Sequence, residues 1–355
     1  MRLSVILLVA IIQGAFFALL VLLLIVNRAR RSLRGRRAAA AANRVNEPMQ
    51  KWLVGAGSAT DLASALRRLP ERDALDQLTI HVAARVTPEH LAQLARALRE
   101  DRWVRRILRQ STSRLWWRRL DAARLLAVVG SVRDRTLLRQ LLADPHAAVQ
   151  AAASICLTRV GDYALVEHVL DTLHTRPPIV RVFQLRILRQ TWHHTVPALL
   201  ERLRPLAALA KLQVWIALAE NLADSRCLAA LVDFRNHPVA EIRISAARAL
   251  RRYLHPDSEN VLREMIRDDD WRVRAQAARG LGALGATSAV PELSFALADR
   301  SWWVRFRSAL ALAQLGETGR RALRIARDRT DRYAGDMAAM VSGLSDGAVV
   351  ELAEA

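Results

Sequence analysis

Apolar and small residues recur along most of this chain with a period of 31 residues. Val273 and Val304 each begin an alanine- and leucine-rich stretch, and these stretches end at Gly285 and Gly316. Counting back from Val273 in steps of 31 reaches further positions without an insertion: Ile242, Lys211, Val180, Val149 and Arg118. We call these seven the reference positions of seven repeats. A fixed period of this length is typical of proteins built from stacked structural units.

The columns of this alignment have the spacing of one helix face. Four and five residues after the reference position stand small residues, such as Ala277 and Ala278, which allow neighbouring helices to approach closely. Eight residues after it stands a leucine: Leu126, Leu157, Leu188, Leu250, Leu281 and Leu312. Twelve residues after it, glycine ends the helix at Gly130, Gly161, Gly285 and Gly316, where we expect a left-handed cap.

A second helix follows in each repeat, until an aspartate such as Asp144, Asp268 or Asp299 marks the next turn. Each repeat is therefore predicted to be a helical hairpin that buries its apolar face only by stacking on its neighbours. The repeats at Val180 and Lys211 depart from the pattern, since Trp192 replaces the terminal glycine and Lys211 replaces an apolar residue. We expect a change of curvature there.

The N-terminal pattern is different, because residues 3–26 are almost wholly apolar. Twenty-four helical residues extend about 36 Å, which is enough to span a bilayer. A cleaved signal peptide is the alternative, but its apolar stretch is shorter, at roughly 7–15 residues. Arginines then follow the apolar run, among them Arg28, Arg30, Arg31, Arg34, Arg36 and Arg37, against Arg2 alone before it. The positive-inside rule predicts a single-pass protein of the bacterial inner membrane, with the N-terminus outside and the repeats in the cytoplasm.

These patterns divide the chain into five predicted parts. They are a transmembrane anchor at 1–27, a basic juxtamembrane linker at 28–52, degenerate helical repeats at 53–114, the regular solenoid at 115–330, and a C-terminal capping helix and tail at 331–355. The juxtamembrane arginines are also expected to bind anionic lipid headgroups, at about 1 kcal/mol each.

Composition and charge restrict the possible classes of function more than they restrict the fold. The chain has 355 residues, is 52% hydrophobic with only 5% aromatic residues, and carries a formal net charge of +20. Its two cysteines, Cys156 and Cys227, form no CxxC pair, and His193-His194 has no accompanying metal-binding motif. We therefore predict no catalytic residues, no metal and no cofactor, and classify the protein as not an enzyme.

The pattern Asp-x-x-Trp-x-Val-Arg, then Ala-Ala and Leu-Gly, resembles the short bacterial HEAT repeats first named after phycobilisome lyases. The resemblance covers residues 115–328 and implies an all-α, right-handed α-solenoid of about 7 to 9 helical hairpins. Such repeats serve lyases, repair proteins and scaffolds alike, so the resemblance does not specify a function. Anchored bacterial proteins of this kind are often associated with family 2 glycosyltransferases that make surface polysaccharide.

Two repeated columns form the candidate partner-binding ridge. Tryptophans stand one or two residues before the reference position, at Trp116, Trp117, Trp271, Trp302 and Trp303. Arginines stand one residue after it, and the ridge includes Arg119, Arg274 and Arg305. Tryptophan and arginine are enriched in interface hot spots. The alternative is structural: each arginine pairs with an aspartate of the neighbouring turn, for instance Asp268 or Asp299, and the tryptophans cover the edge of the core.

The predicted function is a membrane-anchored cytoplasmic scaffold or adaptor that recruits or regulates a membrane-associated protein, such as a surface-polysaccharide glycosyltransferase. The first alternative is a basic solenoid that binds a polyanion, meaning a nucleic acid, a nucleotide or anionic lipid headgroups; the membrane anchor disfavours a genomic role. The second alternative is a chaperone resembling the pigment lyases. The oligomeric state and the binding face stay open at this point.

Overall fold

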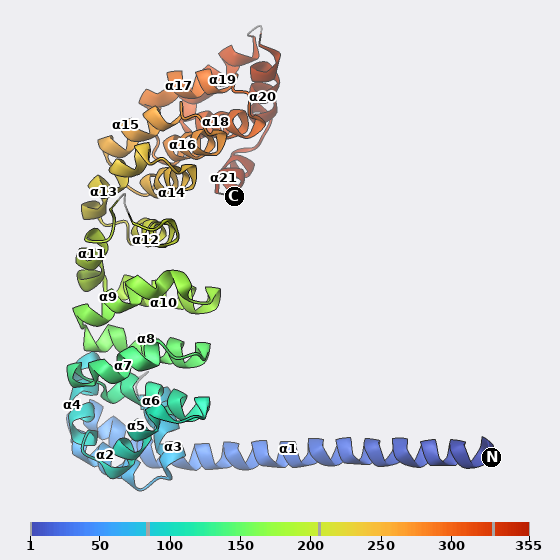
Figure 1. The fold of residues 1–355 in the computed structure, drawn as a ribbon, viewed down its shortest axis with the longest axis vertical. Coiled ribbons are helices and arrows are strands. Elements are labelled where there is room, and N and C mark those ends of the chain that lie inside the picture. Colours follow the sequence, from blue (N-terminus) through green and yellow to red (C-terminus); the bar gives the residue numbers. More distant parts are fainter. Residues whose placement is uncertain (1, 83–85, 205–206, 329–330, 355) are drawn as a thin grey trace. The chain divides into compact units, whose positions relative to one another are not determined.

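The computed structural model describes residues 2–82, 86–204, 207–328 and 331–354, and every regular element in these ranges is a helix (Figure 1). In the first helix, the side chains of residues 2–16, 18–20, 24, 29–34 and 37 are outside this description. The chain divides into two compact units, Met1–Val160 and Gly161–Ala355. The prediction of an all-α stacked helical solenoid is confirmed within each unit.

Unit 1 consists of one long helix and a stack of short ones. Its elements are α1 (Arg2–Leu53), α2 (Ala59–Arg67), α3 (Glu71–Asp76), η1 (Gln77–Val82), α4 (Pro88–Leu98), α5 (Arg102–Arg109), η2 (Gln110–Thr112), α6 (Trp116–Val129), η3 (Val132–Asp134), α7 (Arg135–Leu142) and α8 (Ala147–Val160). The end of α1 buries Ala41, Val45, Met49 and Trp52, whose spacing is that of one helix face. This face packs against α2, α3 and η1, and the stack continues from α2 through α4 and α6 to α8.

Most side chains of the predicted transmembrane segment at 1–27 are not among those that the structure describes. In the part of the chain that the structure describes, no helix is long and apolar enough to cross a membrane. Of the juxtamembrane arginines, Arg28 and Arg36 are exposed, whereas the side chains of Arg30, Arg31, Arg34 and Arg37 lie outside the described set. The helix α1 continues through the predicted linker to Leu53, with Pro48 inside it.

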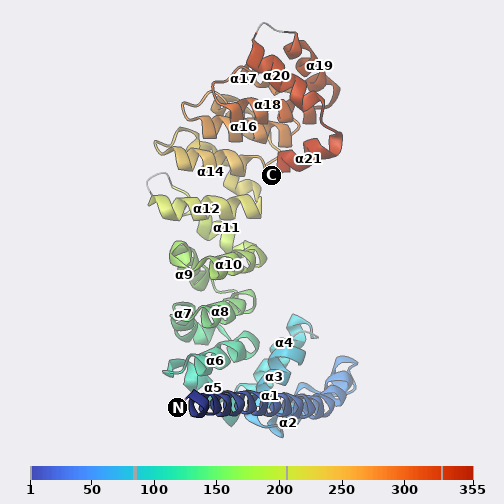
Figure 2. The same cartoon turned by 90° about the vertical axis from the view of Figure 1, so that its right-hand side faces the viewer.

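Unit 2 contains α9 (Tyr163–Thr172), η4 (Leu173–Thr175), α10 (Pro178–Gln190), α11 (Trp192–Leu200), α12 (Leu209–Leu222), η5 (Ser225–Cys227), α13 (Leu228–Asp233), η6 (Phe234–Asn236), α14 (Ala240–Leu250), α15 (Pro256–Met265), α16 (Trp271–Ala283), η7 (Thr287–Ala289), α17 (Val290–Ala296), α18 (Trp302–Gln314), α19 (Gly316–Arg327), α20 (Arg332–Ser342) and α21 (Asp346–Glu354). The first helices of successive repeats pack in one row, from α10 through α12, α14 and α16 to α18 (Figure 2). The second helices pack beside them, as in the contacts of α13 with α15 and of α17 with α19.

The small-residue columns lie where adjacent first helices meet. Ala277, Ala278 and Leu281 in α16 are fully buried, as the sequence predicts. One helical turn after Ala278, a Cβ at Gly282 would lie 2.8 Å from the Ala311 Cα of α18, which is closer than van der Waals contact allows. The backbones of α16 and α18 therefore approach closely because small residues stand at their interface.

The predicted glycine caps divide into two kinds. Gly161, Gly285 and Gly316 have positive φ values, which confirms the left-handed cap at these positions. The prediction was wrong for Gly130, whose φ is −60°. A Cβ there would lie 2.3 Å from the Leu126 carbonyl oxygen, so glycine is needed for space and not for its φ. In the repeat at Lys211, Ala223 takes the left-handed position with φ 50°.

Candidate protein-interaction surface

The turn before the first helix of a repeat is built around an aspartate five residues before the reference position. The Asp268 Oδ1 accepts a hydrogen bond from the Asp270 N–H at 2.9 Å. The Asp299 Oδ1 accepts one from the Ser301 N–H at 2.8 Å. In unit 1, Asp144 does the same with the N–H of the residue two positions on. A carboxylate that accepts the first free N–H groups both closes the turn and starts the helix.

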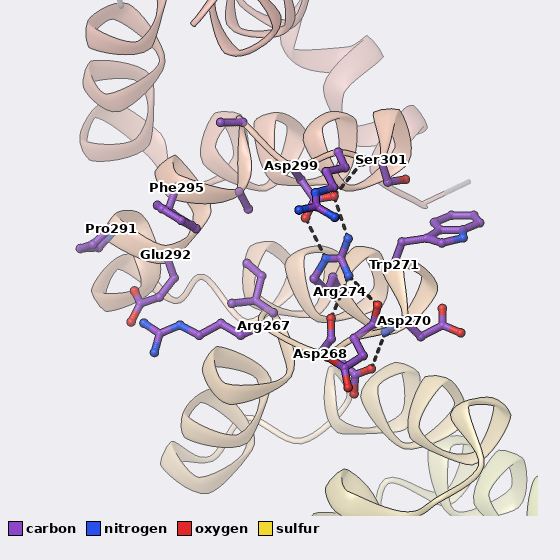
Figure 3. Close-up of a pocket in the computed structure, with 15 residues that line it drawn as sticks. Arg267, Asp268, Asp270, Trp271, Arg274, Pro291, Glu292, Phe295, Asp299 and Ser301 are labelled. Carbon is purple, nitrogen blue, oxygen red and sulfur yellow. Dashed lines mark hydrogen bonds and ion pairs between the residues drawn. The ribbon is translucent and has the colours of Figure 1, made fainter.

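The arginine that follows the reference position connects this turn to the next one (Figure 3). Arg274 Nε and Nη2 donate to the two carboxylate oxygens of Asp299 at 2.7 Å and 2.9 Å. Its Nη1 donates to the carbonyl oxygens of Asp268 and Asp269 at 2.8 Å and 3.0 Å. The hydrogen bonds to Asp299 are the largest cause of the raised pKa of Arg274. This bidentate geometry is the strongest that an arginine makes with a carboxylate.

The same arrangement recurs in other repeats. In unit 1, Arg119 donates to both oxygens of Asp144 and to the carbonyl oxygens of Ser113 and Arg114. In unit 2, Arg243 donates in the same way to Asp268. The structural interpretation of the arginine column is thus confirmed for Arg119 and Arg274, whose side chains are mostly buried. A direct contact of these two arginines with a partner stays a prediction.

Arg305 is the exception in the candidate ridge. Its Nη1 donates to the carbonyl oxygens of Asp299 and Arg300, as in the other repeats. Among the described residues, however, no carboxylate pairs with it, and its Nε is buried without a hydrogen-bond partner. The guanidinium carbon instead lies 5.1 Å from the ring centroid of Tyr333, within the range of a cation–π contact.

The five tryptophans of the ridge are half-exposed, in contrast to the tryptophans of the core. Their exposed fractions run from 39% at Trp116 to 50% at Trp117, whereas Trp215 is 5% exposed. Trp116 stacks on His146 with ring centroids 4.0 Å apart. Trp302 stacks on Phe306 at 4.8 Å and meets the edge of Trp303 at 4.9 Å. Rigid aromatic rings that are held in place and half-exposed have the properties of interface anchors.

A groove of about 1070 Å³ lies beside Trp271 in unit 2, between successive turns. Figure 3 shows Trp271 at one end and Phe295 and Pro291 at the other, with the pair of Arg274 and Asp299 between them. Phe295 is 81% exposed, which is unusual for so large an apolar side chain. The groove therefore offers two apolar ends separated by a neutralised ion pair.

The sequence reasoning missed Phe295, Pro291 and Arg267, which also line this groove. The residues of the ridge stand at the start of first helices, whereas Phe295 and Pro291 stand on the second helix, α17. A signal was available in the sequence: α17 buries Leu293 and Ala296, so Phe295 falls outside its apolar stripe.

The described residues offer no reactive constellation. No group of three or more His, Cys, Asp or Glu side chains among them is placed to hold a metal ion. Burial raises the pKa of the Cys156 thiol to about 12 and that of Cys227 to about 11. Because the thiolate is the nucleophilic form, both cysteines are inert at neutral pH. The absence of catalytic activity itself stays a prediction.

Comparisons with known proteins give a family match for part of the chain and solved structures of low similarity. No curated protein matches the sequence. Among solved structures, an engineered protein is 16% identical, with 88% of this chain and 91% of that chain covered and a TM-score of 0.34. YibA of Escherichia coli is also 16% identical (73% and 98% covered, TM-score 0.35).

The complex of CpcE and CpcF of phycocyanin lyase from Nostoc sp. PCC7120 is 18% identical, covering 72% of this chain and 94% of that chain with a TM-score of 0.30. The family model described as HEAT repeats matches residues 259–341, which include α16 to α19. This part of the chain therefore carries HEAT repeats.

Proposed function

We propose that this protein is a non-enzymatic scaffold, anchored in the bacterial inner membrane, whose cytoplasmic repeats recruit or regulate a membrane-associated protein. The observation that supports it most is the repeated exposure of tryptophan at the start of first helices. A monomer gains little by leaving large aromatic rings half in water, whereas a partner that covers them gains binding energy.

The structure distinguishes the two columns of the ridge in this proposal. The tryptophans and Phe295 supply the contact area, because they are exposed, and Trp271 and Phe295 also line the groove. The arginines Arg119 and Arg274 position this surface, because each is held by an aspartate of the next turn. Arg305, which has no described carboxylate partner, is the arginine of the ridge best placed to pair with an acidic group of the partner.

The test is co-purification of the tagged, full-length protein with its partner after nuclease treatment and a high-salt wash. We compare the wild type with Trp302→Ala plus Trp303→Ala, and separately with Phe295→Ser. A hot-spot aromatic contributes about 2 kcal/mol or more, so each variant should weaken binding about 30-fold or more. The matched control is Ile325→Ser on α19, since Ile325 is 54% exposed but lies outside the ridge and groove.

One stoichiometric membrane protein that is lost from the tryptophan variant and kept by Ile325→Ser supports the proposal. Equal binding by all variants contradicts the assigned surface. If nothing remains bound after salt and nuclease, the stable-scaffold proposal fails and polyanion binding becomes the better account.

A further inference from the structure

Unit 1 contains a groove of its own, lined by residues of α4, α6 and α8 among others. It consists of two adjoining hollows of about 560 Å³ and 500 Å³ that share Ala92 and Arg159 in their walls. The first hollow is mainly apolar, with Ile80, Leu91 and Ile155 in its lining. The second is lined by four arginines: Arg96, Arg99, Arg133 and Arg159. The groove is therefore apolar at one end and strongly basic at the other.

Among the residues that the structure describes, Arg99 alone of these four arginines has a carboxylate partner. Arg99 donates to both oxygens of Asp134 at 2.5 Å and 2.7 Å, and the carboxylate of this partly buried pair also closes the turn at Ser131. Arg96 donates only to the Ala92 carbonyl oxygen, at 3.4 Å. No carboxylate among the described residues pairs with Arg96, Arg133 or Arg159. Three positive charges thus face one small hollow.

Arg159 carries the strongest argument for a ligand. Its Nη2 makes one long hydrogen bond, 3.4 Å, to the Leu91 carbonyl oxygen, and its Nη1 is buried without a hydrogen-bond partner. Burial is the main cause of its lowered pKa. A partly buried guanidinium whose Nη1 has no acceptor is costly to the folded protein, and an anion that accepts from Nη1 removes this cost.

The apolar hollow restricts what that anion is attached to. Ile80 is 54% exposed and Ile155 is 43% exposed, and Leu91 of α4 also lines this hollow. Arg124, the other charged residue of this hollow besides Arg159, is neutralised by Asp76 at 3.0 Å. A free inorganic ion would leave these apolar side chains in water, whereas a ligand with an apolar part would cover them.

We propose that this groove binds a phosphate monoester with an attached apolar group, the phosphate at Arg96, Arg133 and Arg159 and the apolar part against Ile80 and Ile155. A phosphate monoester carries up to two negative charges at neutral pH and several acceptor oxygens, which suits three arginines better than one carboxylate does. Such a ligand comes from two sources, a membrane lipid or a free metabolite.

The test uses the full-length chain in nanodiscs of zwitterionic lipid and measures binding by calorimetry. The probes are hexyl phosphate, inorganic phosphate and hexanol. We expect hexyl phosphate to bind at least about tenfold more tightly than inorganic phosphate, because a few methylene groups leave water. Hexanol should not bind measurably.

Arg159→Gln should weaken hexyl phosphate binding by about tenfold or more, since a charge-assisted contact is lost. It should fold with a melting temperature at or above that of the wild type, because a partly buried cation without a counter-ion has been removed. The matched control is Arg139→Gln, an exposed arginine on α7 outside both hollows, which should bind like the wild type.

A second experiment identifies the source of the ligand. If nanodiscs that contain phosphatidic acid abolish hexyl phosphate binding in the wild type, the ligand is a lipid of the same membrane; if binding persists, it is a soluble metabolite. Equal affinity for hexyl phosphate and inorganic phosphate overturns the amphiphilic ligand. Equal binding by Arg159→Gln and the wild type overturns the site. Neither result depends on the tryptophan surface, so this inference and the proposed scaffold function fail independently.

Discussion

At the scale of single residues, the arginine column combines two roles that one sequence pattern does not separate. Arg274 and Arg119 stand at the same repeat position as Arg305, and all three donate to the carbonyl oxygens of their own turn. They differ in what lies 25 residues further along the chain. Asp299 stands there for Arg274 and Asp144 for Arg119, whereas Arg305 has no aspartate at that distance. The column therefore does not give Arg305 the carboxylate partner that holds the other two arginines.

We predict that Arg274→Met lowers the free energy of unfolding by about 2–4 kcal/mol, because Asp299 is left as a mostly buried carboxylate without its partner. Chemical denaturation of the purified variant measures this change. Arg300→Met is the control, since Arg300 is exposed and should change stability by less than about 0.5 kcal/mol.

Adding Asp299→Asn to Arg274→Met should restore part of the loss, because the uncompensated charge is then removed. Two losses that simply add would show that the pair has no coupling energy, contrary to the structure.

At the scale of the helical element, each hairpin depends on how its first helix ends. In three repeats glycine takes the left-handed φ, because it has no Cβ that would cause steric strain in this conformation. In α12 this position is Ala223, with φ 50°. The backbone there keeps the conformation of the repeat although its side chain is unsuited to it, because the packing of the flanking helices determines the turn.

We therefore expect Ala223→Gly to stabilise the protein by about 0.5–1 kcal/mol, through relief of left-handed strain. The matched control is Ala217→Gly, six residues earlier in the interior of α12, which should destabilise by about 1 kcal/mol. Thermal denaturation compares the two variants. A loss of stability in both would mean that the left-handed conformation at Ala223 carries no strain.

At the scale of the whole molecule, the repeats stabilise one another through nearest-neighbour contacts. First helices pack on first helices and second helices on second helices, so each unit is held by a series of similar interfaces. Such an array supplies long surfaces on which one column of residues recurs at regular intervals, as the tryptophans do within unit 2. The proposed membrane anchor would place these surfaces beside an enzyme of the same bilayer.

This proposal predicts that the full chain stays in the membrane fraction after carbonate extraction, whereas a variant lacking residues 2–27 is released. The reason is the length of the apolar run in the sequence, which is enough to span the hydrocarbon core of a bilayer as a helix. Fusion of a fluorescent reporter that folds only in the cytoplasm to the C-terminus tests the topology. A dark fusion protein, or a full chain released by carbonate, would contradict the proposed anchoring or its direction.

Much of the fold could be predicted from the sequence, because the fold depends on local periodicity. The 31-residue spacing, the small residues at Ala277 and Ala278 and the leucine at Leu281 predicted which helix faces are buried, and the structure buries them. The pairing of arginine with aspartate was also one of the two interpretations of the arginine column, because both residue types recur at fixed repeat positions. The exposed position of the tryptophans agrees with their place at helix starts, outside the buried stripe.

The sites could be predicted only in part, because they depend on residues from several elements. Phe295 and Trp271 line the same groove although they stand on different helices, α17 and α16, and no repeat spacing along the chain relates them. Arg159 resembles many other arginines in the sequence, yet the packing of α8 against α6, and of α6 against α4, buries its Nη1 without a partner. The sequence alone determined the repeat, its all-helical character and the apolar N-terminal run, since these are properties of neighbouring residues. Only the tertiary structure decided which arginines are neutralised and which remain free to bind, because that depends on which carboxylates the stack brings within reach.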